Sequence, residues 1–69
     1  MDIMFYDERD QWIKGFKGVF AVPREGELIT FDRNEEYVVL WVMHDYRDEL
    51  IHVGLRKGTP RDLGFLKRS

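Results

Sequence analysis

The seven residues Tyr37-Val38-Val39-Leu40-Trp41-Val42-Met43 form an unbroken apolar run, which constrains the fold more than any other segment. Seven residues is the length of a strand rather than of a helix, and the run is rich in β-branched and aromatic residues. A strand that is apolar on both faces must be covered on both faces. The run is therefore predicted to be the central strand of a small sheet, with Val39 and Trp41 deeply buried.

Turn residues separate this run from other segments that have the alternation or length of short strands. Pro23 and Gly26 indicate a turn, because proline restricts φ and glycine permits a positive φ. Gly15 and Gly18 argue against a helix and indicate a bend or a bulge. Asn34 is typical of a hairpin connection. The predicted strands are residues 2–7, 11–22, 27–32, 37–43 and 50–57.

Five short strands in a chain of 69 residues fit only a small, strongly bent barrel. Because hairpins join the last three strands into a meander, the pattern favours a single five-stranded antiparallel SH3-like barrel over residues 1–58. An OB topology normally needs a longer chain with a helix between strands. Thr59 and Pro60 are typical of a helix start, and Gly64 ends that helix after about one turn. Residues 59–69 are therefore expected to form a short basic C-terminal turn, helix or tail.

The chain has no cysteine, so neither disulfides nor thiolate metal sites can stabilise it. No apolar run approaches the roughly 18 residues that cross a membrane, and the first residues lack the charge and apolar block of a signal peptide. We therefore expect a cytoplasmic protein with no membrane partner. A core this small contributes only roughly 3–5 kcal/mol, so a homodimer that buries Tyr or Trp is favoured.

The charge is unevenly distributed along the chain. Residues 1–53 carry six basic and twelve acidic side chains, a net charge of −6, whereas residues 54–69 carry a net charge of +4. A basic end on an acidic body could contact nucleic acid or an acidic partner. The alternative is a solubilising tail that balances the charge of the body.

A resemblance to a known group of proteins is carried by four strings: Phe5-Tyr6-Asp7-Glu8, Phe20-Ala21-Val22-Pro23-Arg24-Glu25-Gly26-Glu27-Leu28-Ile29, Tyr37-Val38-Val39 through Val42 to His44-Asp45, and Val53-Gly54-Leu55. They resemble small uncharacterised proteins of bacteria, phages and mobile elements that show an SH3-like barrel pattern. The strings span most of residues 3–56 and consist of turn and core residues, so the resemblance implies a fold and an origin rather than an activity. Residues 12–18 and the basic end after Lys57 depart from the pattern, and a specific function is expected there.

His44 and His52 are the two histidines. If the hairpin pairs residue 44 with residue 50, both histidines lie on one face as diagonal neighbours and could share a ligand. A slip of one residue separates them. A metal would need a third ligand, and Asp45 would point to the opposite face, so no metal is expected. Ligand contact and ordinary strand histidines remain the alternatives.

The chain has few side chains that could act as catalytic nucleophiles or general acids. The chain has no cysteine, its single serine is Ser69, and its threonines Thr30 and Thr59 lie in a strand and a helix cap. No segment places a nucleophile beside a base and an orienting group. The paired carboxylates lie in predicted turns, whereas a general acid needs a buried or coupled carboxyl. They are Asp7, Glu8, Asp10, Asp45, Asp48 and Glu49. Because phosphate loops and cofactor fingerprints are also missing, we expect neither an enzyme nor a cofactor.

Ten aromatic residues exceed what a barrel of this size can hold. Some must therefore lie on the surface, where Trp and Tyr are typical of binding hot spots. Trp12 and Phe16 share one parity and are flanked by Lys14 and Lys17, which predicts an aromatic–basic patch. The patch could stack on bases, bury into a protein partner, or simply cover the end of the barrel. The candidate binding residues are Trp12, Lys14, Phe16, Lys17, His44, Tyr46, His52, Arg56 and Lys57.

These observations predict a non-enzymatic binding module, which the resemblance makes an accessory protein of a phage or mobile element. One hypothesis is contact with a protein, either a second copy of the chain or a host factor that it inhibits. The alternative is binding of single-stranded nucleic acid or a small nucleotide through the aromatic–basic patch. The acidic body favours the protein partner, because nucleic-acid binding needs a basic face.

Overall fold

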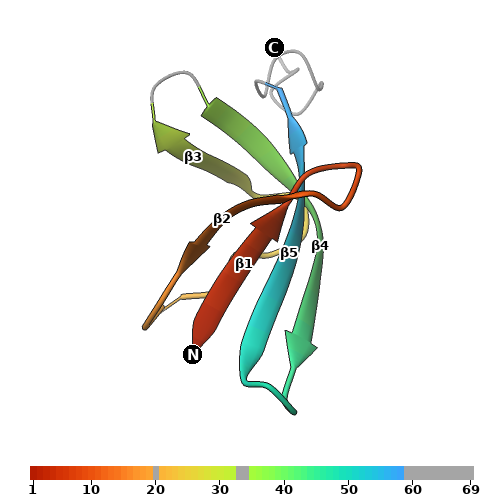
Figure 1. Ribbon diagram of the computed structural model, residues 1–69. Coiled ribbons are helices and arrows are strands. Elements are labelled where there is room, and N and C mark those ends of the chain that lie inside the picture. Colours follow the sequence, from red (N-terminus) through yellow and green to blue (C-terminus); the bar gives the residue numbers. More distant parts are fainter. Residues whose placement is uncertain (20, 33–34, 59–69) are drawn as a thin grey trace.

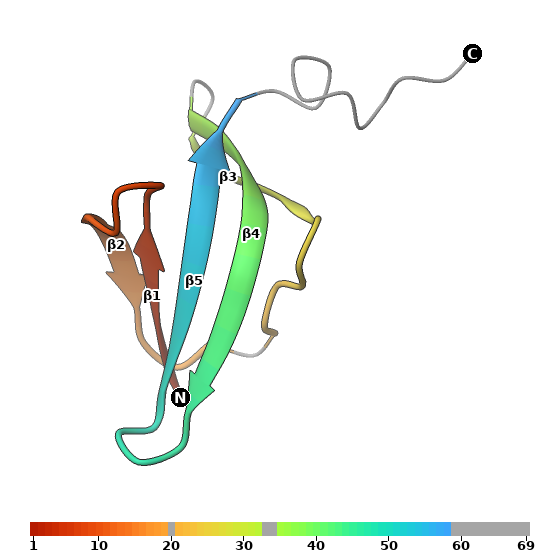
Figure 2. The ribbon, with the colours of Figure 1, turned by 90° about the vertical axis from the view of Figure 1, so that its right-hand side faces the viewer.

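The computed structural model describes residues 1–19, 21–32 and 35–58, and these residues form one curled sheet of five strands (Figure 1). The order of the strands in the sheet is β2-β1-β5-β4-β3. Figure 2 shows the long strands β4 and β5 lying side by side, with the other three strands curling away as a half-barrel. The strands are β1 (Asp2–Tyr6), β2 (Trp12–Phe16), β3 (Leu28–Asp32), β4 (Glu35–Asp45) and β5 (Leu50–Lys57).

All five predicted strands are present, and the β3-β4-β5 meander is confirmed. The all-β prediction also holds for the described residues, among which there is no helix. The turn at Gly26 has the positive φ that was predicted, 89°. The expectations for Asn34 and for residues 59–69 lie outside the described residues.

The prediction of a purely antiparallel sheet is wrong for one ladder. β1 pairs with β5 in parallel, from Asp2 opposite Leu50 to Tyr6 opposite Gly54, whereas the other three ladders are antiparallel. A hairpin dictates antiparallel pairing only between strands that follow each other in the chain. β1 and β5 do not, so only the tertiary fold determines their relative direction.

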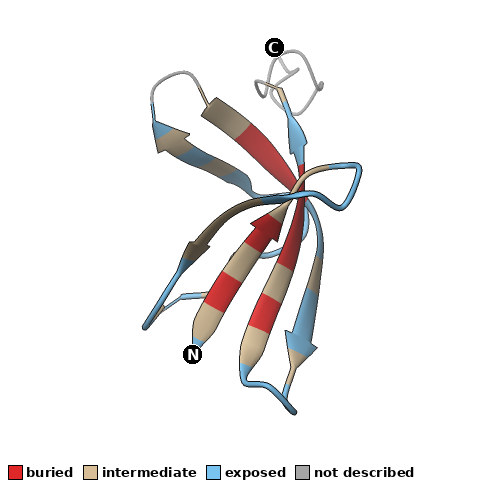
Figure 3. Ribbon diagram, in the orientation of Figure 1, coloured by how far each residue is buried: buried red, intermediate tan, exposed pale blue. Residues whose placement is uncertain are grey.

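The core lies on the concave face of the half-barrel. Ile3 and Phe5 of β1 pair with Ile51 and Val53 of β5, and all four are buried. Figure 3 shows the buried bands alternating along β1 and the first half of β5, as the period of two requires, and a continuous buried stretch in β4. The buried core cluster consists of Ile3, Phe5, Tyr37, Val39, Ile51, Val53 and Leu55.

A bulge in β4 corrects the prediction for Trp41. Val39 lies opposite Leu55, but Trp41 lies opposite Gly54, so Leu40 is an extra residue without a direct partner. The extra residue reverses the alternation that follows it. Val39 is 1% exposed, as predicted, whereas Trp41 lies on the convex face and is 38% exposed. The prediction that Trp41 is deeply buried is therefore wrong.

Candidate functional site

The convex face of the sheet carries a row of large side chains from four strands. Alternation places Met4 and Tyr6 of β1 on this face. Trp12 pairs with Tyr6, and Trp41 pairs with Gly54, so both tryptophans also lie on this face. Trp12 is 61% exposed, and its indole N–H points at the Met4 sulfur, 3.4 Å away. We call this surface the convex platform, formed by Met4, Tyr6, Trp12, Trp41, Met43 and His52.

Stacked rings form the centre of the platform. The Tyr6 ring lies nearly parallel to the Trp41 indole, with 6.4 Å between centroids and 17° between planes. It also stacks on the His52 ring, with 5.6 Å between centroids. The register aligns Tyr6, Gly54 and Trp41 in one row across three strands. Because Gly54 has no side chain, the indole can lie across its backbone.

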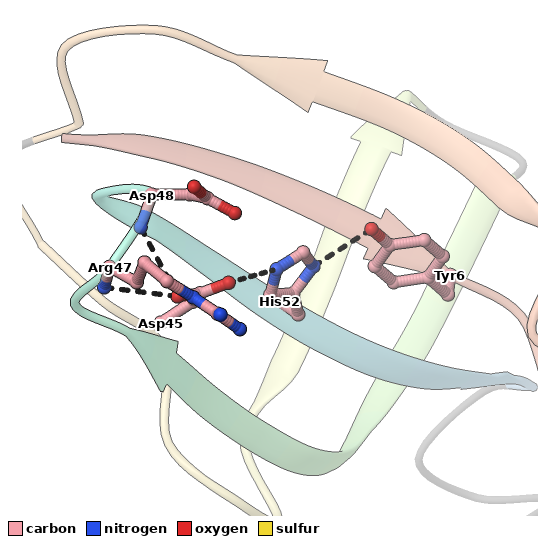
Figure 4. A network of polar contacts seen from close by, with 5 residues as sticks. All are labelled: Tyr6, Asp45, Arg47, Asp48 and His52. Carbon is pink, nitrogen blue, oxygen red and sulfur yellow. Dashed lines mark hydrogen bonds and ion pairs between the residues drawn. The ribbon is translucent and has the colours of Figure 1, made fainter.

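A polar array fixes the edge of this stack (Figure 4). The Tyr6 hydroxyl lies 2.8 Å from Nδ1 of His52, and Nε2 of His52 lies 3.8 Å from Oδ2 of Asp45. The backbone N–H groups of Arg47 and Asp48 donate to the other Asp45 oxygen, at 3.1 and 3.2 Å. In the tautomer protonated on Nε2, His52 accepts from Tyr6 and directs its N–H toward Asp45. The array therefore holds the phenol and imidazole rings in a defined orientation.

The β4–β5 register is shifted by one residue from the one that would pair the two histidines, so the alternative in which they separate holds. His44 lies opposite Ile51 and Met43 lies opposite His52, so the histidines point to opposite faces. Asp45, which was expected to point away from His52, shares its face. The hairpin loop is residues 46–49, one residue shorter than expected, because the Asp45 side chain caps the turn and Glu49 takes a positive φ of 56°.

His44 instead accompanies the other aromatic candidate of this hairpin. Its ring stacks on Tyr46, with 6.2 Å between centroids and 28° between planes. Tyr46 lies in the turn after β4 and is 78% exposed. This pair is separate from the convex platform.

The predicted aromatic–basic patch is divided between the two faces. Trp12 lies opposite Tyr6, whereas Phe16 lies opposite Ile3 on the concave face. The cause is Ile13, an extra residue in β2 that reverses the alternation. Lys14 accompanies Phe16, with its ammonium 5.3 Å from the Phe31 ring centroid. Lys17 is exposed in the segment after β2.

Arg56 and Lys57 also separate, because neighbours in a strand point to opposite faces. Arg56 is on the convex side, 3.7 Å from Glu8, and both side chains are more than half exposed. Such a pair contributes little to stability. Lys57 lies opposite Tyr37 and lines a cavity of about 310 Å³ with it.

The pKa of the Tyr37 phenol is displaced from its ordinary value. Burial raises the pKa of its phenol above the ordinary value, and nearby carboxylates raise it further. The acidic neighbours, in decreasing order of effect, are Glu35, Asp32 and Asp7. Tyr37 therefore stays protonated, as its place in the core cluster requires.

Sequence reasoning missed most of the platform. The outward alternation of residues 2–6 could have identified Met4 and Tyr6, since Ile3 and Phe5 are the inward pair. Trp41 and Met43 had no such signal, because the bulge at Leu40 decides their face. Of the nine candidate residues, Trp12 and His52 belong to the platform.

The described part of the chain contains no group of three or more His, Cys, Asp or Glu side chains that could hold a metal ion. Within the same residues there is also no helix long and apolar enough to cross a membrane. Comparisons with models of known protein families, with curated proteins and with solved structures find no match. What the chain binds is therefore inferred from its own surface.

Proposed function

We propose that the chain is a non-enzymatic binding module that contacts a protein partner through the convex platform. The observation that supports this is the exposure of Trp12, Trp41 and Met43 side by side with the Tyr6–His52 stack. Aromatic residues and methionine are enriched at the centres of protein interfaces. The stack and the hydrogen bonds already order these rings, so binding loses little conformational entropy.

The charges around the platform favour a protein over nucleic acid. Asp2 and Asp45 lie on the same face as the platform, and the convex-face cation Arg56 is next to Glu8. Phosphate groups would approach these carboxylates unfavourably, and nucleic-acid binding draws most of its affinity from phosphate contacts. A partner that presents a basic side chain beside apolar ones would match both the aromatic faces and the acids.

The finer fold assignment and the biological setting belong to the same proposal. Five short strands, the meander and the half-barrel shape support an SH3-like barrel, although its β1–β5 ladder is parallel. The accessory role in a phage or mobile element, with a host factor or a second copy as the partner, rests on the resemblance described above. The cytoplasmic location remains a prediction.

Affinity purification from the host with a Trp12→Ala variant tests the proposal. Tyr46→Ala is the matched control, because Tyr46 is an exposed aromatic residue outside the platform. The wild-type protein and the control should retain one defined partner, which Trp12→Ala should lose while keeping its melting temperature. If the partner is a second copy, sedimentation should show a dimer that Trp12→Ala converts to a monomer.

Titration with single-stranded oligonucleotides and nucleotides at low salt distinguishes the alternative function. We expect no change in tryptophan fluorescence. Quenching that Trp12→Ala removes, and that weakens as salt rises, would contradict the protein-binding proposal and assign the platform to nucleic acid.

A further inference from the structure

The half-barrel is open between its two edge strands. β2 and β3 are the ends of the strand order, and no ladder joins them in the described part of the chain. In Figure 1 the two strands diverge and leave one side of the sheet open. Side chains bridge this opening instead: Phe16 of β2 stacks on Phe31 of β3, with 6.0 Å between centroids. Among the described residues, β2 and β3 therefore each have a neighbouring strand on one side only.

The free edge of β3 presents backbone groups in a regular order. The Val39 N–H donates to the Glu27 carbonyl at 2.9 Å and the Val39 carbonyl accepts from the Gly26 N–H at 2.8 Å, so the backbone groups of Val39 point toward the β3 side. Hydrogen-bonded and non-hydrogen-bonded pairs alternate along an antiparallel ladder. The pairs of Leu28 with Val38 and of Thr30 with Glu36 are therefore non-hydrogen-bonded, and the N–H and C=O groups of Leu28 and Thr30 point away from β4.

The free edge of β2 is protected, but that of β3 is not. β2 has a bulge at Ile13 and carries Lys14 and Gly15, which are features that discourage pairing with a further strand. β3 has neither lysine nor proline, and its single irregularity comes after Thr30. Leu28 is 46% exposed on this edge. β3 is therefore the edge that can receive a strand.

An open apolar groove of about 830 Å³ lies beside this edge on the concave side. Its walls include Phe16, Val22, Ile29 and Phe31. Its charged lining is Arg24 and Glu27, and the Glu27 carboxylate already accepts the Arg24 backbone N–H at 2.7 Å. Lys14 adds a further cation over the Phe31 ring. The groove is thus mainly apolar, with Lys14 as the cation over its Phe31 wall.

We propose that an extended segment of a partner protein adds to the free edge of β3 as a sixth strand. Its backbone pairs with Leu28 and Thr30, and every second side chain enters the groove, as the period of a strand requires. These inward side chains are apolar, and one at the end near Lys14 is acidic. This peptide site lies on the concave side and is independent of the convex platform.

The test uses the synthetic peptide Ac-Thr-Val-Thr-Val-Thr-Glu-Thr-NH2 and amide NMR of the full chain. The amides of Leu28 and Thr30 should shift and exchange more slowly with solvent when the peptide is added. Two control peptides carry N-methyl groups, either on the threonines or on the valines and glutamate. A strand pairs through alternate residues, so one control should lose binding and the other should retain it.

Two variants of the protein sharpen the test. Thr30→Pro removes an outward N–H without breaking the ladder to β4, and it should abolish binding. Lys14→Gln should weaken the glutamate peptide several-fold, but leave the affinity for the same peptide with glutamine unchanged. If Thr30→Pro does not fold, the two N-methylated peptides still decide the question.

Several results would overturn the proposal. Equal binding of both N-methylated peptides means that the groove takes apolar side chains without strand pairing. Shifts at Trp12 and Met43 instead of Leu28 and Thr30 place the peptide on the convex platform. Protection of Leu28 and Thr30 that grows with protein concentration, without peptide, assigns the edge to a second copy. No shift at millimolar peptide also contradicts it.

Discussion

The indole of Trp41 lies across the backbone of Gly54, in the space that a side chain at residue 54 would occupy. The two residues are ladder partners, and Tyr6 is the next partner in the same row. This contact buries Gly54 although it lies on the convex face. It also sets the position of the indole against Tyr6, so the packing of β4 on β5 and the shape of the convex platform depend on one glycine.

Gly54→Ala should destabilise the protein by about 1–3 kcal/mol, because the new Cβ overlaps the indole. Gly15→Ala is the matched control: its Cβ would meet the flexible Met4 side chain, 2.9 Å from the sulfur, and should cost less. Urea denaturation measures the free energy of unfolding of both variants. The double variant Gly54→Ala/Trp41→Ala should lose less than the two single losses combined, since the overlap is gone. A wild-type denaturation midpoint for Gly54→Ala would contradict the contact.

Trp41→Ala should cost less than Ile51→Ala. From the apolar run, the sequence predicts that Trp41→Ala removes roughly 3–5 kcal/mol and unfolds the protein. The structure revises this expectation, because Trp41 is partly exposed whereas Ile51 is fully buried. We expect less than about 3 kcal/mol for Trp41→Ala and about 2–5 kcal/mol for Ile51→Ala. Loss of cooperative unfolding in Trp41→Ala alone would restore the interpretation of a buried Trp41.

Glu49→Gly should stabilise the protein by up to about 1 kcal/mol. Glu49 adopts a φ of 56°, a conformation that is unfavourable for a residue with a Cβ and accessible to glycine. Asp10 has a similar φ of 63°, but aspartate tolerates it better, so Asp10→Gly should gain less. Asp48→Gly, in the same loop without a positive φ, is the control and should not raise the melting temperature. Thermal unfolding of the three variants checks the order.

Alkaline pH should destabilise the wild-type protein more than a Tyr37→Phe variant. The pKa of Tyr37 is raised in the folded state above the ordinary value of 10.0. The unfolded chain therefore releases this proton at a lower pH than the folded protein does. The contribution of the protonated phenol to stability is fully present below the unfolded-state pKa, and it is lost as the pH rises through the folded-state pKa. Denaturation midpoints between about pH 8 and about pH 11 should diverge for the two proteins. If the denaturation midpoints of the two proteins changed with pH in parallel, the raised pKa of Tyr37 would be contradicted.

Local patterns were sufficient for the strands and turns. Alternation and the apolar run predicted β1, β3, β4 and β5 to within about two residues, whereas β2 ends at Phe16, well before the predicted end at residue 22. The turn chemistry of Pro23 and Gly26 correctly placed the turn before β3. The burial of Val39 followed from the apolar run. These features depend on neighbours in the chain, because the side chains of a strand alternate with a period of two and turns need particular φ values.

Only the tertiary structure decided which face each side chain occupies and how distant strands pair. The extra residues Ile13 and Leu40 reverse the alternation, which moves Trp12 away from Phe16 and brings Trp41 to the convex face. A bulge is set by the partner strand, so the alternation of a single strand does not reveal it. The same holds for the β4–β5 register, which separates His44 from His52, and for the parallel pairing of β1 with β5. The sequence by itself determined the strands, and the contacts between strands determined the surface that they build.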